Sequence, residues 1–218
     1  MKYQPLFGLS LFLLMLGVQA QAQKSQNILL PPPQTEGGRP LMQVLKDRKS
    51  DRSFDSKALS DQMLSNLLWA AFGINRTDRG MRTAPSAMNW QEMDIYVALN
   101  NGLYIYNAKL HSLDLVAGED LRGSTGMQDF AGEAPVNLVF VADYKKMGDA
   151  PDEFKDPMAN ADAGFIAQNV YLFCASEGLG TVVRAMIDRK QLASLMQLRD
   201  TQRIILAQTV GYVKSSRE

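Results

Sequence analysis

Residues 159–177 constrain the fold most, because they form a helical pattern that is apolar on nearly all sides. Gln168 and Asn169 are its polar patch, and the glycines of Gly178-Leu179-Gly180 mark its end. A helix of this kind must be buried, either in the middle of a domain or at an interface between subunits. The rest of the fold has to provide that cover.

The other elements predict a sheet in which neighbouring strands are mostly antiparallel. Residues 136–142 form a continuous apolar run of strand length, which is typical of a central strand. Residues 94–99 and 103–106 flank Asn100-Asn101-Gly102, a turn sequence that predicts a β-hairpin. Further strands are predicted at residues 113–116, 181–184 and 203–212, helices at 40–47, 60–73, 119–125 and 188–195, and loops at 79–91 and 144–156. Since no regular βαβ alternation appears, the predicted fold class is α+β, with a largely antiparallel sheet covered by helices.

The first residues resemble an export signal. Lys2 precedes an apolar run at residues 6–18, and Val18-Gln19-Ala20 offers small residues at cleavage positions, with Ala20-Gln21-Ala22 as a second choice. The run is short for a membrane span, which favours a cleaved signal over an uncleaved anchor. We therefore predict a signal peptide at residues 1–22, a Pro/Gly-rich linker at 23–39 and one domain at 40–218. The mature protein is then periplasmic or secreted.

Composition excludes several classes of function. The chain has 23 basic and 23 acidic residues, so nothing favours nucleic acid or an anionic membrane as a partner. Cys174 is the one cysteine, which rules out an intramolecular disulfide, and its apolar surroundings predict a buried, inert thiol. With one histidine and one cysteine in the sequence, no metal site is predicted. That histidine, His111, is predicted to lie on the surface.

Residues 48–54, with the sequence R-K-S-D-R-S-F, form the first of three polar stretches. In an extended segment Arg48, Ser50 and Arg52 point the same way. Two guanidinium groups with a hydroxyl between them suit a planar or phosphorylated ligand. The alternative is a solvated basic linker.

The second stretch, residues 82–91, turns at Pro85 and presents Ser86, Asn89 and Gln91, whose groups both donate and accept hydrogen bonds. This mixed capacity suits a heteroaromatic ring, and the alternative is an ordinary turn that enters a strand. The third stretch, residues 178–184, reads by itself as a helix C-cap. It matches neither a G-x-G-x-x-G dinucleotide motif nor a phosphate loop.

Together, in this order and spacing, the three stretches resemble the FMN-dependent nitroreductase family. The family's R-R-S-x-R-x-F corresponds to residues 48–54 with a Lys at the second place, and its P-S-x-x-N-x-Q corresponds to residues 85–91. A long buried helix then leads to G-L-G, and the last strand ends in G-Y, so the likeness runs from about Leu41 to Lys214. Residues 68–76, 128–130 and 141–144 are similar to the SagB-type dehydrogenase subgroup.

The resemblance implies a set of cofactor-binding residues. Arg48, Lys49 and Ser50 would hold the FMN phosphate and ribityl chain, and Arg52 would reach the pyrimidine edge of the flavin. Further contacts would come from Pro85, Ser86, Asn89 and Gln91 of a partner subunit, from Arg184, Ala185 and Met186 against the ring, and from Lys214 with Arg217 at the phosphate. The long helix, including Phe165, Gln168 and Asn169, would form the core of an intertwined homodimer.

The implied function is an FMN-dependent oxidoreductase with a ping-pong cycle. No side chain is expected to act as acid or base, since the flavin N5 carries the chemistry. The donor is NAD(P)H in the family, and another donor is open for an exported enzyme. The substrate would be a small organic molecule such as a nitroaromatic, a quinone or an azoline-like ring. Two alternatives stay open: a flavin-binding or storage protein without turnover, and a flavin-free pseudoenzyme that acts as an interaction module.

Overall fold

The computed structural model describes residues 26–214 of the 218-residue chain. The predicted signal peptide at residues 1–22 and the predicted phosphate contact Arg217 lie outside these residues. In the part of the chain that the structure describes, no helix combines the length and hydropathy needed to cross a membrane.

One seven-stranded sheet organises the molecule, and every neighbouring pair of its strands is antiparallel. Its strands, in spatial order, are β1 (Ile28–Leu29), β6 (Ser112–Ala117), β5 (Gly102–Asn107), β4 (Met93–Leu99), β7 (Val136–Asp143), β9 (Gln202–Gly211) and β8 (Gly180–Arg184). The β4–β5 hairpin and the central position of β7 are confirmed, and every residue of β7 is buried. A small hairpin, β2 (Ile74–Arg76) with β3 (Met81–Arg82), lies outside this sheet and was not predicted.

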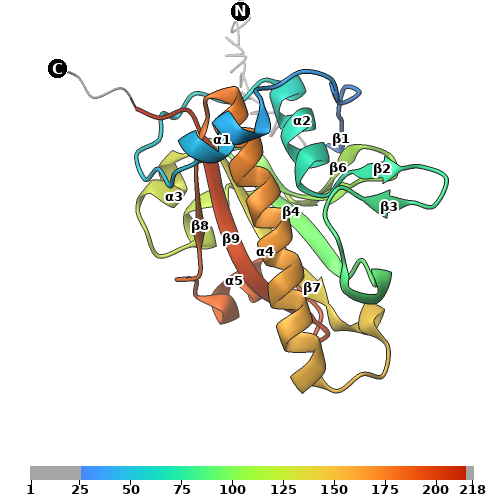
Figure 1. Ribbon diagram of the computed structural model, residues 1–218. Coiled ribbons are helices and arrows are strands. Elements are labelled where there is room, and N and C mark those ends of the chain that lie inside the picture. The colour runs from blue at the N-terminus through green and yellow to red at the C-terminus, as the bar shows by residue number, and fades with distance from the viewer. Residues whose placement is uncertain (1–25, 215–218) are drawn as a thin grey trace, which may run out of the picture.

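Helices cover both faces of the sheet (Figure 1). They are α1 (Leu41–Asp47), α2 (Asp61–Phe72), α3 (Phe130–Glu133), α4 (Asp152–Glu177) and α5 (Arg189–Leu195), with short 3₁₀ turns η1 (Ala87–Asn89), η2 (Arg122–Thr125) and η3 (Tyr144–Met147). The predicted caps are confirmed: Ser60 accepts the Met63 N–H at 3.2 Å, and Asp188 accepts the Gln191 N–H at 3.0 Å. The predicted α+β class, with a mostly antiparallel sheet covered by helices, is therefore confirmed.

The sheet separates two apolar cores because side chains alternate between its faces. Ile95 and Val97 of β4 face the core beneath α2 and α4, whereas Tyr96 and Ala98 of the same strand face the core beneath α5. Figure 1 shows α4 running across the sheet, with α1 and α2 beside its C-terminal half. This helix is the scaffold on which the polar stretches are arranged.

Helix α4 differs from its prediction in two ways. It begins at Asp152, so the loop predicted at residues 144–156 is wrong: η3 and the first turn of α4 occupy much of it. Asp152 and Glu153 suit the positive end of the helix dipole, although their charge made the segment look like a loop. Only one face of α4 is buried within the chain, and Phe165 on the other face is 48% exposed.

Residues predicted as a linker lie against the domain from Ile28 onward, since β1 pairs with β6 and Leu30 is buried. The surface position predicted for His111 is wrong. Its Nε2 lies 2.7 Å from Ser65 Oγ, its Nδ1 lies 2.9 Å from Tyr106 Oη, and burial lowers its pKa. Cys174 is fully buried as predicted, and burial raises the pKa of its thiol.

Candidate ligand-binding site

Residues 48–54 leave α1 as an extended segment that lies along β8. The Asp51 N–H donates to the Thr181 carbonyl at 3.0 Å, and the buried Phe54 bridges Val213. Gly180 makes this approach possible, because a Cβ there would lie 3.1 Å from the Asp51 Cβ and 2.6 Å from Val213 Cγ2. The fold therefore brings the first and third polar stretches together, and the second glycine of G-L-G serves packing.

The two arginines of this segment have no anionic partner. The Arg48 guanidinium lies 5.3 Å from the centre of the Tyr171 ring and forms no ion pair within residues 26–214. Arg52 is exposed and, in the same residues, makes neither a hydrogen bond nor an ion pair. Two partner-free guanidinium groups on one short segment form a site ready for an anion.

Tyr171 of α4 fixes this segment, and sequence reasoning did not identify it. Its hydroxyl shares a 2.8 Å hydrogen bond with Ser50 Oγ and accepts the Val183 N–H at 3.0 Å. One side chain thus links the helix, the segment and β8. The signal in the sequence is a hydroxyl-bearing aromatic within an otherwise apolar helix, seven residues before its glycine cap.

The two lysines predicted at the phosphate are engaged with carboxylates. Lys49 Nζ lies 3.2 Å from Asp51 Oδ1, and Lys214 Nζ lies 2.9 Å from Glu133 Oε2. The Lys214 N–H also donates to the Ser53 carbonyl at 3.2 Å, so the chain end runs beside the segment. Both lysine side chains are exposed, and exposed pairs are weak enough to be exchanged for a stronger anion.

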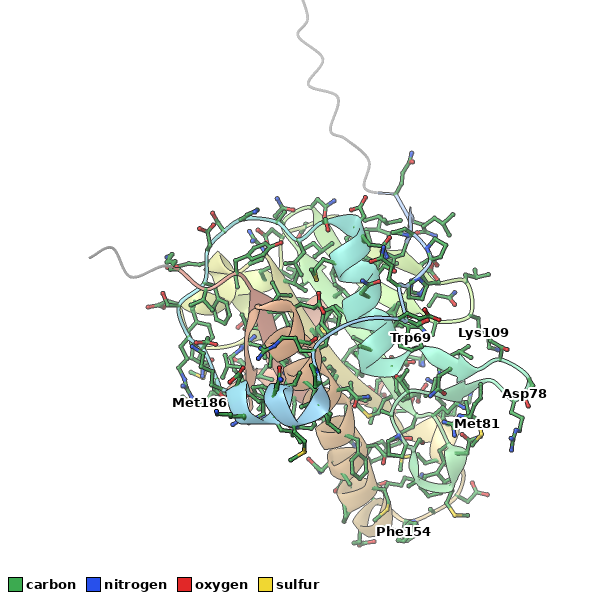
Figure 2. The ribbon with its side chains drawn as sticks, turned by 45° about the horizontal axis from the view of Figure 1, so that its top comes forward. Trp69, Asp78, Met81, Lys109, Phe154 and Met186 are labelled. Carbon is green, nitrogen blue, oxygen red and sulfur yellow. The ribbon has the colours of Figure 1, made fainter. Side chains whose placement is uncertain are left out.

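The Arg184 side chain lies inside the protein and is not available to a ligand at the surface. Its guanidinium donates to the Thr125 carbonyl at 2.9 Å, Thr125 Oγ1 at 3.1 Å, Asn137 Oδ1 at 2.9 Å and Thr209 Oγ1 at 3.0 Å. Burial lowers the pKa of Arg184 to about 10. A contact from this position to a ligand is left to the main chain and to the exposed Ala185 and Met186. Figure 2 shows Met186 at the edge of the molecule.

The second polar stretch forms a tight turn whose polar groups mostly bond one another. Ser86 Oγ accepts the Gln91 N–H at 2.8 Å, and Gln91 Nε2 donates to Asn89 Oδ1 at 3.1 Å. Met88, Asn89 and Gln91 have positive φ angles of 53°, 54° and 48°. The exposed members of this turn are Pro85, Met88 and Asn89, whereas Ser86 and Gln91 hold its shape.

This turn does not join the arginine segment within one chain. The Ala87 N–H donates to Asp162 of α4 at 2.9 Å, whereas the arginine segment contacts Tyr171 of the same helix. Those two helix positions are about 13 Å apart along the axis, at 1.5 Å per residue. A single chain therefore presents two separate half-sites along α4.

Next to the turn, two buried carboxyl groups form a contact that sequence reasoning missed. Glu92 and Asp162 are almost completely buried, and they interact with each other. The sequence offered Glu92 with Asp94, but Asp94 instead pairs with Lys146 at 2.6 Å. Burial, reinforced by Asp162, raises the pKa of Glu92 to about 7.

Comparison with known proteins identifies the class. The model of the nitroreductase family matches residues 45–212, so the chain belongs to this family. A crystal structure from Ralstonia eutropha JMP134, described as a nitroreductase, is 44% identical, with a TM-score of 0.85; the match covers 99% of this chain and 100% of that one. A protein of Methanocaldococcus jannaschii assigned to the nitroreductases is 31% identical, over 73% of this chain and 85% of that protein.

More distant structures share the fold. The Escherichia coli microcin synthetase complex McbBCD, with a truncated peptide precursor bound, includes a chain that is 20% identical, with a TM-score of 0.67; the match covers 88% of this chain and 80% of that one. An FMN-dependent nitroreductase of Clostridium difficile is 18% identical, with a TM-score of 0.56 and coverage of 81% and 90%. The chain thus has the nitroreductase fold that the sequence predicted.

Proposed function

We propose that this protein is an FMN-dependent oxidoreductase. The observation that carries the proposal is the pair of guanidinium groups, on Arg48 and Arg52, that have no anionic partner beside β8. Family membership supplies FMN as the ligand, and FMN combines a phosphate with a planar heteroaromatic ring. The donor set therefore fits the cofactor at both of its ends.

The residues of the arginine segment divide the work of binding. Arg48 and Ser50, positioned by Tyr171, hold the phosphate and ribityl chain, and Lys49 joins them after leaving Asp51. Arg52 lies at the pyrimidine edge, where a fixed cation favours negative charge on the ring. When bound, FMN supplies hydride chemistry at N5, next to the main chain of Ala185 and Met186.

A second copy of the chain completes this site. Exposed apolar side chains occur on α1 at Leu41 (60%) and Met42 (76%) and on α4 at Phe165 (48%). A homodimer that covers these groups buries the second face of α4, as its apolar sequence requires. It also places the turn at residues 85–91 of one subunit, led by Pro85 and Asn89, against the flavin of the other.

For the reaction, we propose a ping-pong cycle in which a donor and a small organic acceptor use the flavin in turn. The donor is NAD(P)H or, outside the cytoplasm, another reductant, because residues 1–22 resemble an export signal. Candidate substrates are nitroaromatics, quinones and azoline-like rings. The segments at residues 68–76, 128–130 and 141–144 favour a SagB-type dehydrogenase within the family.

The first test is the absorbance spectrum of the purified protein, with the released chromophore identified after denaturation. FMN is the expected chromophore, and a colourless protein that takes up no added FMN contradicts the proposal. The double variant R48A/R52A should lose FMN, while R79A is a matched control, since Arg79 is exposed and paired with Asp78. Steady turnover with a reductant distinguishes an enzyme from a flavin store.

A further inference from the structure

Two buried acidic side chains hold the turn at residues 85–91 from beneath. Glu92 is 0% exposed at the entry to β4, and Asp162 is 3% exposed on α4. Ser86 Oγ donates to Glu92 Oε2 at 3.1 Å, and the Ala87 N–H donates to Asp162 Oδ2 at 2.9 Å. Each carboxyl group thus binds one residue of the turn, and the two carboxyl groups interact with each other.

The contact between these carboxyl groups needs a proton. Two ionised carboxylates repel, and burial makes that repulsion and the loss of hydration more costly. Glu92 Oε1 is buried and has no donor among residues 26–214. A proton on this oxygen, donated to the Asp162 carboxylate, removes the repulsion and gives the oxygen its missing partner.

No basic side chain neutralises the pair, because the charged groups on the surrounding elements are engaged elsewhere. Arg82 donates to Gln91 Oε1 at 2.8 Å, Lys146 pairs with Asp94 at 2.6 Å, and Arg199 pairs with Asp143 at 2.6 Å. Asp143 shows the contrast: there, hydrogen bonds and Arg199 outweigh burial and lower the pKa of the carboxyl. A cation stabilises the buried charge of Asp143, whereas the Glu92–Asp162 pair requires a proton.

We propose that Glu92 and Asp162 share one proton and act as a positioning pair that fixes the turn at residues 85–91 for the flavin of the partner subunit. This inference rests on the proposed function, because the turn matters for FMN only if it lines the site. Removal of the proton leaves two adjacent buried charges, and the turn loosens. FMN binding therefore weakens as the pH rises past neutrality.

The variant E92Q tests the protonation state directly. A glutamine amide N–H donates to Asp162 as the protonated acid does, and its carbonyl still accepts from Ser86. E92Q should therefore keep FMN affinity at pH 6 and lose the pH dependence, while the wild-type dissociation constant rises by about tenfold toward pH 9, the change that one pKa unit of coupling represents. D94N is the matched control, since it removes a carboxylate of the same strand, and it should follow wild type.

A second measurement needs no flavin. Thermal unfolding of the apoprotein should occur at lower temperature at pH 8 than at pH 5.5 in the wild type, with little change in E92Q. If Glu92 and Asp162 were merely structural, E92Q and wild type would show parallel pH profiles in both measurements, and that result overturns the proposal. If E92Q does not fold, D162N applies the same neutralisation from the helix side.

The two measurements separate this inference from the proposed function. A wild-type protein that binds no FMN at any pH, but shows the pH-dependent unfolding that E92Q abolishes, keeps the shared proton and refutes the cofactor. A protein that binds FMN with no pH-dependent unfolding in the apo form refutes the shared proton and keeps the cofactor.

Discussion

The arginines at the edge of the sheet and the arginine inside it have opposite surroundings. Arg48 and Arg52 lie on an extended surface segment without an anionic partner, whereas Arg184 is 4% exposed and donates to oxygens of Thr125, Asn137 and Thr209. The partners of Arg184 are neutral, so nothing balances its charge, and burial lowers its pKa. The edge pair is available to a ligand, and the interior arginine connects β7, β8 and β9 to η2.

The difference teaches that side-chain charge alone does not assign a function. A buried guanidinium is tolerated only when the surrounding groups satisfy its donors, and it then contributes to stability as a cross-link. An exposed guanidinium without a partner contributes little to stability and can bind an anion at little structural cost. The two regions should therefore respond differently to mutation: one through unfolding and the other through binding.

The largest effect is expected for R184L. The substitution leaves acceptors on Thr125, Asn137 and Thr209 buried without their donor, and this should lower the free energy of unfolding by about 3–5 kcal/mol. Urea unfolding of the apoprotein measures the change, with R79A as the exposed control within about 0.5 kcal/mol. A loss below about 1 kcal/mol in R184L would show that water replaces the guanidinium.

The edge pair should show the converse. R48A/R52A removes two charge-assisted contacts of about 1.5–3 kcal/mol each and should weaken FMN binding by about a hundredfold or more. The free energy of unfolding of the apoprotein should stay within about 1 kcal/mol of wild type, since neither side chain holds a buried partner. Flavin fluorescence titration gives the affinity, and a large loss of stability would contradict the comparison.

A steric test sharpens the interior side of the comparison. A Cβ at Gly126 would lie 1.6 Å from Arg184 Nη1, so G126A forces the guanidinium out of place. Overpacking of this kind typically costs about 1–3 kcal/mol. In the R184L background the clash partner is gone, and G126A should cost less than in wild type. Equal costs in the two backgrounds would mean that Gly126 serves the backbone and not Arg184.

The hydrophobic pattern predicted the frame of the molecule because strands and helices have fixed side-chain periods. It placed β4, β5 and β7 and the caps at Ser60 and Asp188, since these depend on neighbouring residues in the chain. The inward orientation of Arg184 depends on space beside Gly126 and on acceptors from three other elements. No local pattern encodes such an arrangement, so the residue was predicted as a ligand contact.

The same limit applies to the acid pair and to Tyr171. Glu92 and Asp162 are 70 positions apart in the sequence, and their contact exists only once α4 lies across the sheet. Tyr171 lies on a helix predicted for its apolar character, which hid its hydroxyl contacts with Ser50 and Val183. The motif identified which segments form the site, and the tertiary structure determines which side chains hold those segments in place.

A smaller effect is expected for Y171F, which tests how the edge pair is positioned. The phenylalanine keeps the ring beneath Arg48 but removes the hydroxyl that joins Ser50 to the Val183 N–H. The loss should be about 1 kcal/mol in the free energy of unfolding and a several-fold weaker FMN affinity, because one shared hydroxyl is lost. S50A measured in parallel separates the Ser50 bond from the Val183 bond, and an unchanged affinity in both variants would show that Arg48 needs no such support.

The smallest effect is expected for K214A. Lys214 and Glu133 are each about half exposed, and an exposed pair of this kind contributes about 0–1 kcal/mol to stability. If Lys214 exchanges Glu133 for the FMN phosphate, K214A should weaken FMN binding several-fold at low salt and less at high salt, since screening removes exposed charge contacts first. E133Q is the informative companion, because releasing Lys214 from its carboxylate should strengthen FMN binding if the lysine reaches the phosphate. Equal affinities in wild type, K214A and E133Q would place Lys214 outside the site and leave the phosphate to the arginines of the edge segment.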